Sequence, residues 1–174
     1  MTNAAGDEVR VRGAGDFQAC SAELETLLGL GSECLTEPCA MNGVYQPSVD
    51  GITFYAGATL YYKIHGLKAK GFAAATNHDS YTPTPAQVAE AGRAQCALSY
   101  DAAVTDDPYG ANYCFASAFI VRVLAAMRIP TNSTQVVYSR TVPPGGSDYS
   151  FDWARGAQIY RNTMEELYLH DPLR

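Results

Sequence analysis

The sequence predicts an α/β domain, because signals for helices and signals for strands follow one another along its 174 residues. Helix signals cover residues 16–28, 84–98 and 112–127. Polar and apolar side chains alternate, as they do in strands, over residues 8–12 and 135–140. A chain of this length fits one domain, and its 47% hydrophobic and 17% charged residues are typical of a folded protein with a core.

The first of these helices is expected to follow the short strand at residues 8–12 and a glycine break. The break is Gly13-Ala14-Gly15, and Asp16 after it can cap the helix. Gly13-x-Gly15 lacks a third glycine and the Lys-Ser/Thr pair of a phosphate-binding loop, so we interpret these glycines as a turn. The apolar stripe of the helix consists of Phe17, Cys20, Leu24, Leu27 and Leu28, and Gly29 and Gly31 end the pattern.

Residues 34–62 lead from a pair of cysteines through a turn to an aromatic segment. Asn42-Gly43 is expected to form the turn, because positive φ is cheap there. Residues 44–46 then form a short extended segment, predicted to be a strand, that Pro47 stops. Residues 54–67 are apolar and are expected to begin as a loop and to continue as a helix.

The second half begins with the best-defined helix start of the chain, the capping box Thr84-Pro85-Ala86-Gln87. Residues 100–110 are expected to form a loop. We interpret Asp106 and Asp107 as a solvated turn rather than a metal site, because two adjacent carboxylates point in different directions. The helix that opens at Asn112 has an apolar stripe consisting of Ala116, Ile120, Val123, Leu124 and Met127.

Charge and hydropathy indicate which kinds of partner, such as nucleic acids or membranes, the chain could bind. The net charge of −6, with scattered Lys and Arg, argues against binding to the phosphate backbone of a nucleic acid. No stretch approaches the roughly twenty apolar residues that span a bilayer, so a membrane could be reached only through segments outside this chain. Residues 1–15 lack the apolar centre of a signal peptide.

The five cysteines favour disulfides over a zinc site, because they form no Cys-x2-Cys pair and have no neighbouring histidines. Disulfides indicate an oxidising location, either extracellular or in the lumen of the secretory pathway. The sequon Asn132-Ser133-Thr134 makes Asn132 a candidate for glycosylation in such a compartment. His65, His78 and His170 are far apart in sequence and are expected to be surface or packing residues.

Four segments spread over about residues 9–169 carry a family resemblance. Cys34-x4-Cys39 is followed by Asn42-Gly43-Val44-Tyr45-Gln46-Pro47 and by the aromatic run Phe54-Tyr55-Ala56. The other three segments are Gly13-Ala14-Gly15-Asp16-Phe17-Gln18-Ala19-Cys20, Tyr113-Cys114-Phe115 and Trp153-x-x-Gly156. In order and spacing they resemble the apyrases, the nucleoside triphosphate diphosphohydrolases.

The resemblance implies a fold and a disulfide pattern. The chain would be a single partial domain, residues 1–174, forming the C-terminal portion of an actin-like, ribonuclease-H-like lobe with a mixed sheet and several helices. The N-terminal lobe and the phosphate-binding loops would lie outside this chain, which would therefore be a fragment. Cys20 would be unpaired here, because its partner in the family lies further upstream. The disulfides that the resemblance implies join Cys34 to Cys39 and Cys96 to Cys114.

The resemblance also implies an activity for a longer parent enzyme. That enzyme would hydrolyse nucleoside tri- or diphosphates to the monophosphate and orthophosphate with Mg or Ca as the divalent cation. Tyr61 and Tyr113 would hold the nucleobase between their rings, and Trp153 and Gly156 would lie near the phosphate and metal centre. Tyr109 stands where family members commonly carry an arginine that contacts the nucleotide. Neither a catalytic residue nor a metal ligand is expected in this chain, which should be inactive alone.

Two other functions stay open. The chain could be a non-catalytic nucleotide-binding or interaction module that keeps the aromatic clamp. It could also be a disulfide-stabilised secreted domain in which Tyr61 and Tyr62 are half-buried core residues whose hydroxyls reach water. Trp153 has the same ambiguity, because it lies on an apolar helical face and could be only a core anchor.

Overall fold

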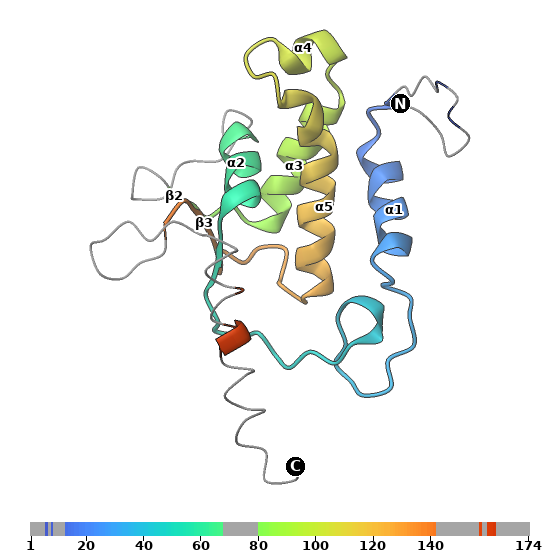
Figure 1. Cartoon of the computed structure of the whole chain (residues 1–174), viewed down its shortest axis with the longest axis vertical. Coiled ribbons are helices and arrows are strands. Elements are labelled where there is room, and N and C mark those ends of the chain that lie inside the picture. Colours follow the sequence, from blue (N-terminus) through green and yellow to red (C-terminus); the bar gives the residue numbers. More distant parts are fainter. Residues whose placement is uncertain are drawn as a thin grey trace.

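The computed structural model describes residues 13–67 and 80–141, together with residues 6, 8, 157 and 160–162. It has a mixed α/β architecture, in which helices pack beside a small sheet (Figure 1). The α/β class is therefore confirmed, while the actin-like lobe stays a prediction. In chain order the elements are α1 (Phe17–Leu27), η1 (Met41–Gly43), β1 (Phe54–Ala56), α2 (Ala58–Leu67), β2 (Ser80–Tyr81), α3 (Pro85–Cys96), α4 (Tyr100–Val104), η3 (Gly110–Asn112), α5 (Tyr113–Ala126) and β3 (Val136–Ser139).

The sheet has the strand order β1-β3-β2, so the last strand in sequence lies in the middle. β1 runs parallel to β3 with Phe54 opposite Val136, and β2 runs antiparallel to β3 with Ser80 opposite Ser139. The expected strand near residues 135–140 is confirmed as β3. The expected loop at the start of residues 54–67 is wrong, because Phe54 N–H donates to the Gln135 carbonyl over 2.9 Å and pairs this segment with β3.

Helix α5 is the centre of the helical layer. It contacts α1 on one side and α2 and α3 on the other, as Figure 1 shows. Six of its residues are buried, which fits a helix that is covered on several sides. The buried residues are Tyr113, Ser117, Ala118, Ile120, Leu124 and Ala126.

The predicted caps are confirmed. Asp16 Oδ1 accepts hydrogen bonds from the N–H groups of Gln18 and Ala19, each over 2.9 Å, and so begins α1. Thr84 and Gln87 form the reciprocal bonds of a capping box at the start of α3. The Asn42-Gly43 turn is also confirmed, since both residues adopt positive φ.

Three local expectations need correction. Leu27 is 73% exposed, because α1 buries Phe17, Ser21 and Leu24 at a spacing that turns Leu27 away from α5. Residues 100–110 are not wholly a loop, because Ser99 caps the short helix α4 through its hydroxyl. The extended segment at residues 44–46 makes a single bridge, between Tyr45 and Cys39, rather than a strand. The strand expected at residues 8–12 lies mostly outside the described residues.

Candidate functional site

Tyr113, at the first position of α5, packs against α2. Its side chain is only 6% exposed. A Cβ atom at Gly66 of α2 would overlap the tip of the Tyr113 ring, so the ring lies directly on the helix backbone. The ammonium nitrogen of Lys63, one turn earlier in α2, lies 5.1 Å from the centre of the same ring. The first helical turn of α5 and the last turns of α2 therefore form one face.

Asp107 completes this arrangement. The Tyr113 hydroxyl donates a hydrogen bond to Oδ2 of Asp107, and the Tyr109 N–H donates to Oδ1 over 2.8 Å. The first of these bonds is the main reason why the pKa of Asp107 is lowered, and the positive charge of Lys63 adds to it. Burial, followed by the bond to Asp107, raises the pKa of Tyr113. The prediction of a solvated turn holds for Asp106, which is exposed, but is incomplete for half-buried Asp107.

The structure places Tyr61 in the core. Its side chain is 2% exposed, and its ring centre lies 5.9 Å from that of Tyr81. The Tyr61 hydroxyl lies 3.4 Å from Nδ1 of His65, and the same nitrogen lies 2.8 Å from the Tyr81 hydroxyl. His65 is therefore a packing residue, as predicted. The burial of Tyr61 agrees with the core interpretation, and its role as a base-stacking ring stays a prediction.

The expectation that Tyr62 is a half-buried core residue is wrong. It is 56% exposed, whereas Tyr61 beside it is buried. Tyr62 stands four residues before Gly66, so it lies on the side of α2 that Tyr113 contacts. Helical periodicity contained the signal, because Tyr61, Ile64 and Leu67 recur at buried spacing and leave Tyr62 outside the stripe.

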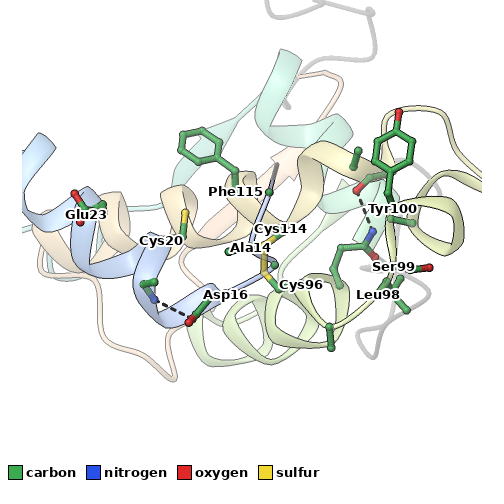
Figure 2. A pocket seen from close by; sticks show the side chains of 18 residues that line it. Ala14, Asp16, Cys20, Glu23, Cys96, Leu98, Ser99, Tyr100, Cys114 and Phe115 are labelled. Carbon is green, nitrogen blue, oxygen red and sulfur yellow. Dashed lines mark hydrogen bonds between the residues drawn. A yellow bond between two sulfur atoms is a disulfide. The ribbon is translucent and has the colours of Figure 1, made fainter. Parts of the chain in front are cut away.

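A pocket of about 1100 Å³ opens on another face, between the start of α1, the end of α3, α4 and the start of α5 (Figure 2). The Cys96–Cys114 disulfide joins α3 to α5 at this pocket, and Cys20 also lines it. Exposed Tyr100 and Phe115 give the pocket an aromatic rim. Tyr61 and Tyr113 do not line it, so the pocket and the face around Tyr113 are separate.

The cysteines pair as the resemblance implied. The disulfides are Cys34–Cys39 and Cys96–Cys114. Among the described residues Cys20 is free, and burial raises the pKa of its thiol. Disulfide use favours an oxidising, secretory or extracellular environment.

Other predicted sites lie partly outside the part of the chain that the structure describes. Trp153, Gly156, His78 and His170 are among the residues that are not described. Asn132 is described and exposed, in the turn between α5 and β3. The described residues contain no cluster of three or more His, Cys, Asp or Glu that could hold a metal ion. Within the same residues, no helix is long and apolar enough to cross a membrane.

The described residues form a mixed α/β domain in which a disulfide joins α3 to α5 and in which tyrosines lie on α2 and at the start of α5. Comparison with known families identifies the class of protein. Residues 2–169 match the GDA1/CD39 (nucleoside phosphatase) family, and the chain belongs to that family.

Three similar relatives have names in keeping with this family. "Probable apyrase 3" of Arabidopsis thaliana is 29% identical over 161 residues, which are 88% of this chain and 31% of that protein. "Ectonucleoside triphosphate diphosphohydrolase 1" of Mus musculus is 25% identical over 137 residues, 76% of this chain and 25% of the relative. "Probable apyrase 5" of Arabidopsis thaliana is 26% identical over 160 residues, with shares of 87% and 30%. The chain therefore matches about a third or less of the length of these relatives.

Proposed function

We propose that this chain is the base-holding portion of an enzyme that hydrolyses nucleoside tri- or diphosphates to the monophosphate and orthophosphate. The family match over residues 2–169 is the observation that carries this proposal. The relatives are named as an ectonucleoside triphosphate diphosphohydrolase and as probable apyrases, and both names agree with a nucleotide substrate. The rest of the enzyme, including an N-terminal lobe with the phosphate-binding loops, would be supplied by a longer protein.

The divalent cation, Mg or Ca, belongs to that longer protein in our proposal. Hydrolysis of a phosphoanhydride needs the phosphate charges neutralised and a water molecule oriented. The described residues have no acidic or histidine cluster that fits such an ion. Trp153 and Gly156 are proposed to lie near the phosphate and metal centre, and the 174-residue chain alone is expected to be inactive.

Tyr113 is proposed to contact the base from the α5 side. Aromatic stacking tolerates different bases, so the enzyme would accept several nucleotides. Tyr61 was the predicted partner from α2, but both its ring and that of Tyr113 are buried, with exposures of 2% and 6%, so either ring would have to be uncovered to meet a base. Tyr62 is already exposed on the side of α2 that carries Gly66. It is therefore a second candidate for the α2 ring of the clamp.

Phosphate release tests the proposal. ATP, ADP, GDP and UDP would each be supplied with Mg or Ca to this chain and to a longer chain that includes the upstream lobe. Activity only in the longer chain would support the proposal, whereas activity in the short chain would contradict the assignment of the catalytic groups to other segments. Nucleotide binding without hydrolysis in either chain would favour a binding module.

Replacement of single tyrosines tests the clamp. ADP affinity of the longer chain would be measured by calorimetry for Tyr61→Ala, Tyr62→Ala and Tyr113→Ala. Loss of one stacking ring is expected to weaken affinity by roughly five- to 150-fold, because a stacked base contributes about 1–3 kcal/mol. If Tyr61→Ala lowers stability and leaves affinity unchanged, Tyr61 is a core residue and Tyr62 becomes the clamp candidate.

The cellular location is proposed to be extracellular or in the lumen of the secretory pathway. The two disulfides are the supporting observation. A second candidate function is that of a disulfide-stabilised secreted domain without nucleotide binding, which the burial of both predicted clamp rings favours. Failure of the longer chain to bind any of the four nucleotides would favour this second function.

A further inference from the structure

The ring of Tyr113 is held at three points by groups from two separate segments. Gly66 lies beneath the tip of the ring, and Lys63 places its ammonium group over the ring at 5.1 Å. Asp107 accepts the hydrogen bond of the hydroxyl. Gly66 and Lys63 belong to α2, whereas Asp107 belongs to the turn that precedes α5.

We propose that Asp107 is a positioning residue for the nucleotide site, which holds the ring of Tyr113 between Gly66 and Lys63 through the tyrosine hydroxyl. The part of this inference that concerns the nucleotide rests on the proposed function. The part that concerns the ring does not. Asp107 itself is not assigned a contact with substrate.

The carboxylate of Asp107 is itself fixed in place. Its Oδ1 accepts the Tyr109 N–H over 2.8 Å, and its backbone carbonyl accepts the Gly110 N–H over 2.8 Å. This turn leaves Oδ2 for the Tyr113 hydroxyl. A side chain restrained by its own backbone loses little conformational freedom when it binds a second group, so it makes an effective anchor.

The turn that carries Asp107 is also attached to the helices around it. The Gln95 side chain, buried in α3, donates from Nε2 to the Gly110 carbonyl over 3.0 Å. Gly110 lies so close to the Ala103 carbonyl of α4 that a Cβ atom would overlap it. The anchor of Tyr113 is therefore connected to α3 and α4 rather than to a free loop.

Gly66 indicates that the ring position matters more than local helix stability. Glycine inside a helix costs about 1 kcal/mol relative to alanine. Gly66 lies within α2 and does not have a positive φ, so its backbone conformation alone does not require glycine. The overlap that a Cβ atom would make with Tyr113 supplies the reason. α2 therefore accommodates the ring in the position that Asp107 fixes.

Lys63 contributes charge to the same unit. Its ammonium nitrogen lies 5.9 Å from the centre of the Tyr109 ring as well as 5.1 Å from that of Tyr113. The positive charge of Lys63 also helps to lower the pKa of Asp107. Because aromatic ring currents shift the signals of nearby groups, the Lys63 resonances are expected to report whether the Tyr113 ring is in place.

The experiment uses Asp107→Ala and Asp107→Asn, with Asp106→Asn as the matched control. Asp106 is the adjacent aspartate and is exposed. The first measurement needs no nucleotide: the NMR signals of the Lys63 side-chain methylenes are recorded in the 174-residue chain, where the rings of Tyr109 and Tyr113 are expected to shift them. They should move toward the values of a solvated lysine in Asp107→Ala and stay in place in Asp106→Asn. Asp107→Asn keeps an acceptor oxygen and should give an intermediate shift.

The second measurement is the affinity of the longer chain for ADP and UDP. Asp107→Ala should weaken both by roughly tenfold, because one charge-assisted hydrogen bond is lost. Asp107→Asn should recover part of the affinity, a rescue that unfolding would not show. Unchanged Lys63 signals in Asp107→Ala would overturn the proposal, as would wild-type affinity for both nucleotides in that variant.

The two measurements separate this inference from the proposed function. If the wild-type longer chain binds neither ADP nor UDP, the proposed function fails. The use of the ring for nucleotides is then overturned, while moved Lys63 signals would still support Asp107 as the anchor of Tyr113. If Asp107→Ala does not fold, as judged by circular dichroism, Asp107→Asn takes its place. Unchanged Lys63 signals or wild-type affinity for both nucleotides in that variant would then overturn the proposal.

Discussion

Gly92 of α3 lies directly against Ser117 of α5, so closely that a Cβ atom on Gly92 would stand 2.7 Å from the Ser117 Cβ. Both residues are buried. The Ser117 hydroxyl donates to the Cys114 carbonyl over 2.8 Å, which keeps this polar side chain satisfied in the interface. The approach of α3 and α5, and with it the position of Tyr113, depends on two small residues, Gly92 and Ser117.

Replacement of Gly92 by alanine is therefore expected to destabilise the chain, although alanine is the better helix former. The new methyl group would also stand 2.7 Å from the ring of Phe17 on α1. Overpacking of this kind costs about 1–3 kcal/mol. Urea unfolding measures the change, and Gly31→Ala is the control because a Cβ atom there meets nothing within 4 Å. A Gly92→Ala variant as stable as the wild type would show that α3 and α5 can separate at little cost.

Local chemistry explains which parts of the fold the sequence could predict. The caps at Asp16 and Thr84 and the turn at Asn42-Gly43 depend on residues within four positions of one another, and all three are confirmed. β1 was missed because its hydrogen bonds go to a strand far along the chain. Three residues carry too little pattern to signal such a pairing.

In the candidate site, too, the sequence could predict local features but not long-range contacts. Helical spacing alone could have separated buried Tyr61 from exposed Tyr62, since Ile64 follows Tyr61 at three residues. The bond between Asp107 and Tyr113 could not be predicted, because it requires the turn at Asp107 and the first turn of α5 to form together. Long-range packing, which periodicity does not encode, brings Lys63 to the same ring.

Removal of the Cys96–Cys114 disulfide is expected to cost more than removal of Cys34–Cys39. The sequence separations are 18 and 5 residues, and the entropy of loop closure predicts losses of about 3 and about 2 kcal/mol. The double Cys→Ala variants would be compared by urea unfolding without reductant. Cys20→Ala is the control, since Cys20 is free among the described residues. Equal stability of the wild type and the Cys96→Ala/Cys114→Ala variant would contradict a stabilising role for that disulfide.

Asn132 is expected to be glycosylated when the chain is produced in a eukaryotic secretory pathway. The residue is exposed in a turn where the Ser133 N–H donates to the Pro130 carbonyl over 2.9 Å, so a transferase could reach it. Mass spectrometry should find a glycan that an N-glycosidase removes and that Asn132→Gln and Thr134→Ala lack. Ser133→Ala keeps the sequon and should keep the glycan. An unmodified wild-type chain from the secretory pathway would disprove the assignment.

The bond between Tyr113 and Asp107 predicts how stability depends on pH. The pKa of Asp107 is lower in the folded chain than in the unfolded one, so the unfolded state binds more protons as the pH falls. The stability that the carboxylate contributes is therefore complete above its ordinary pKa of about 3.9. It disappears as the pH falls through the lower, folded value. The charged and titratable groups facing this carboxylate are Lys63, His65 and Tyr113.

The contribution of the Asp107 carboxylate to stability is obtained by comparing the wild type with Asp107→Asn. The difference in unfolding free energy, measured with urea, should be constant from about pH 7 to pH 5 and should shrink below about pH 4. Asp106→Asn is the control, since Asp106 is exposed and the Tyr113 hydroxyl bonds to Asp107 instead. A difference that grows as the pH falls would mean that the folded chain favours the protonated carboxyl group. In that case the Tyr113 hydroxyl could not be the donor to a carboxylate, and the anchor proposed for the ring would be lost.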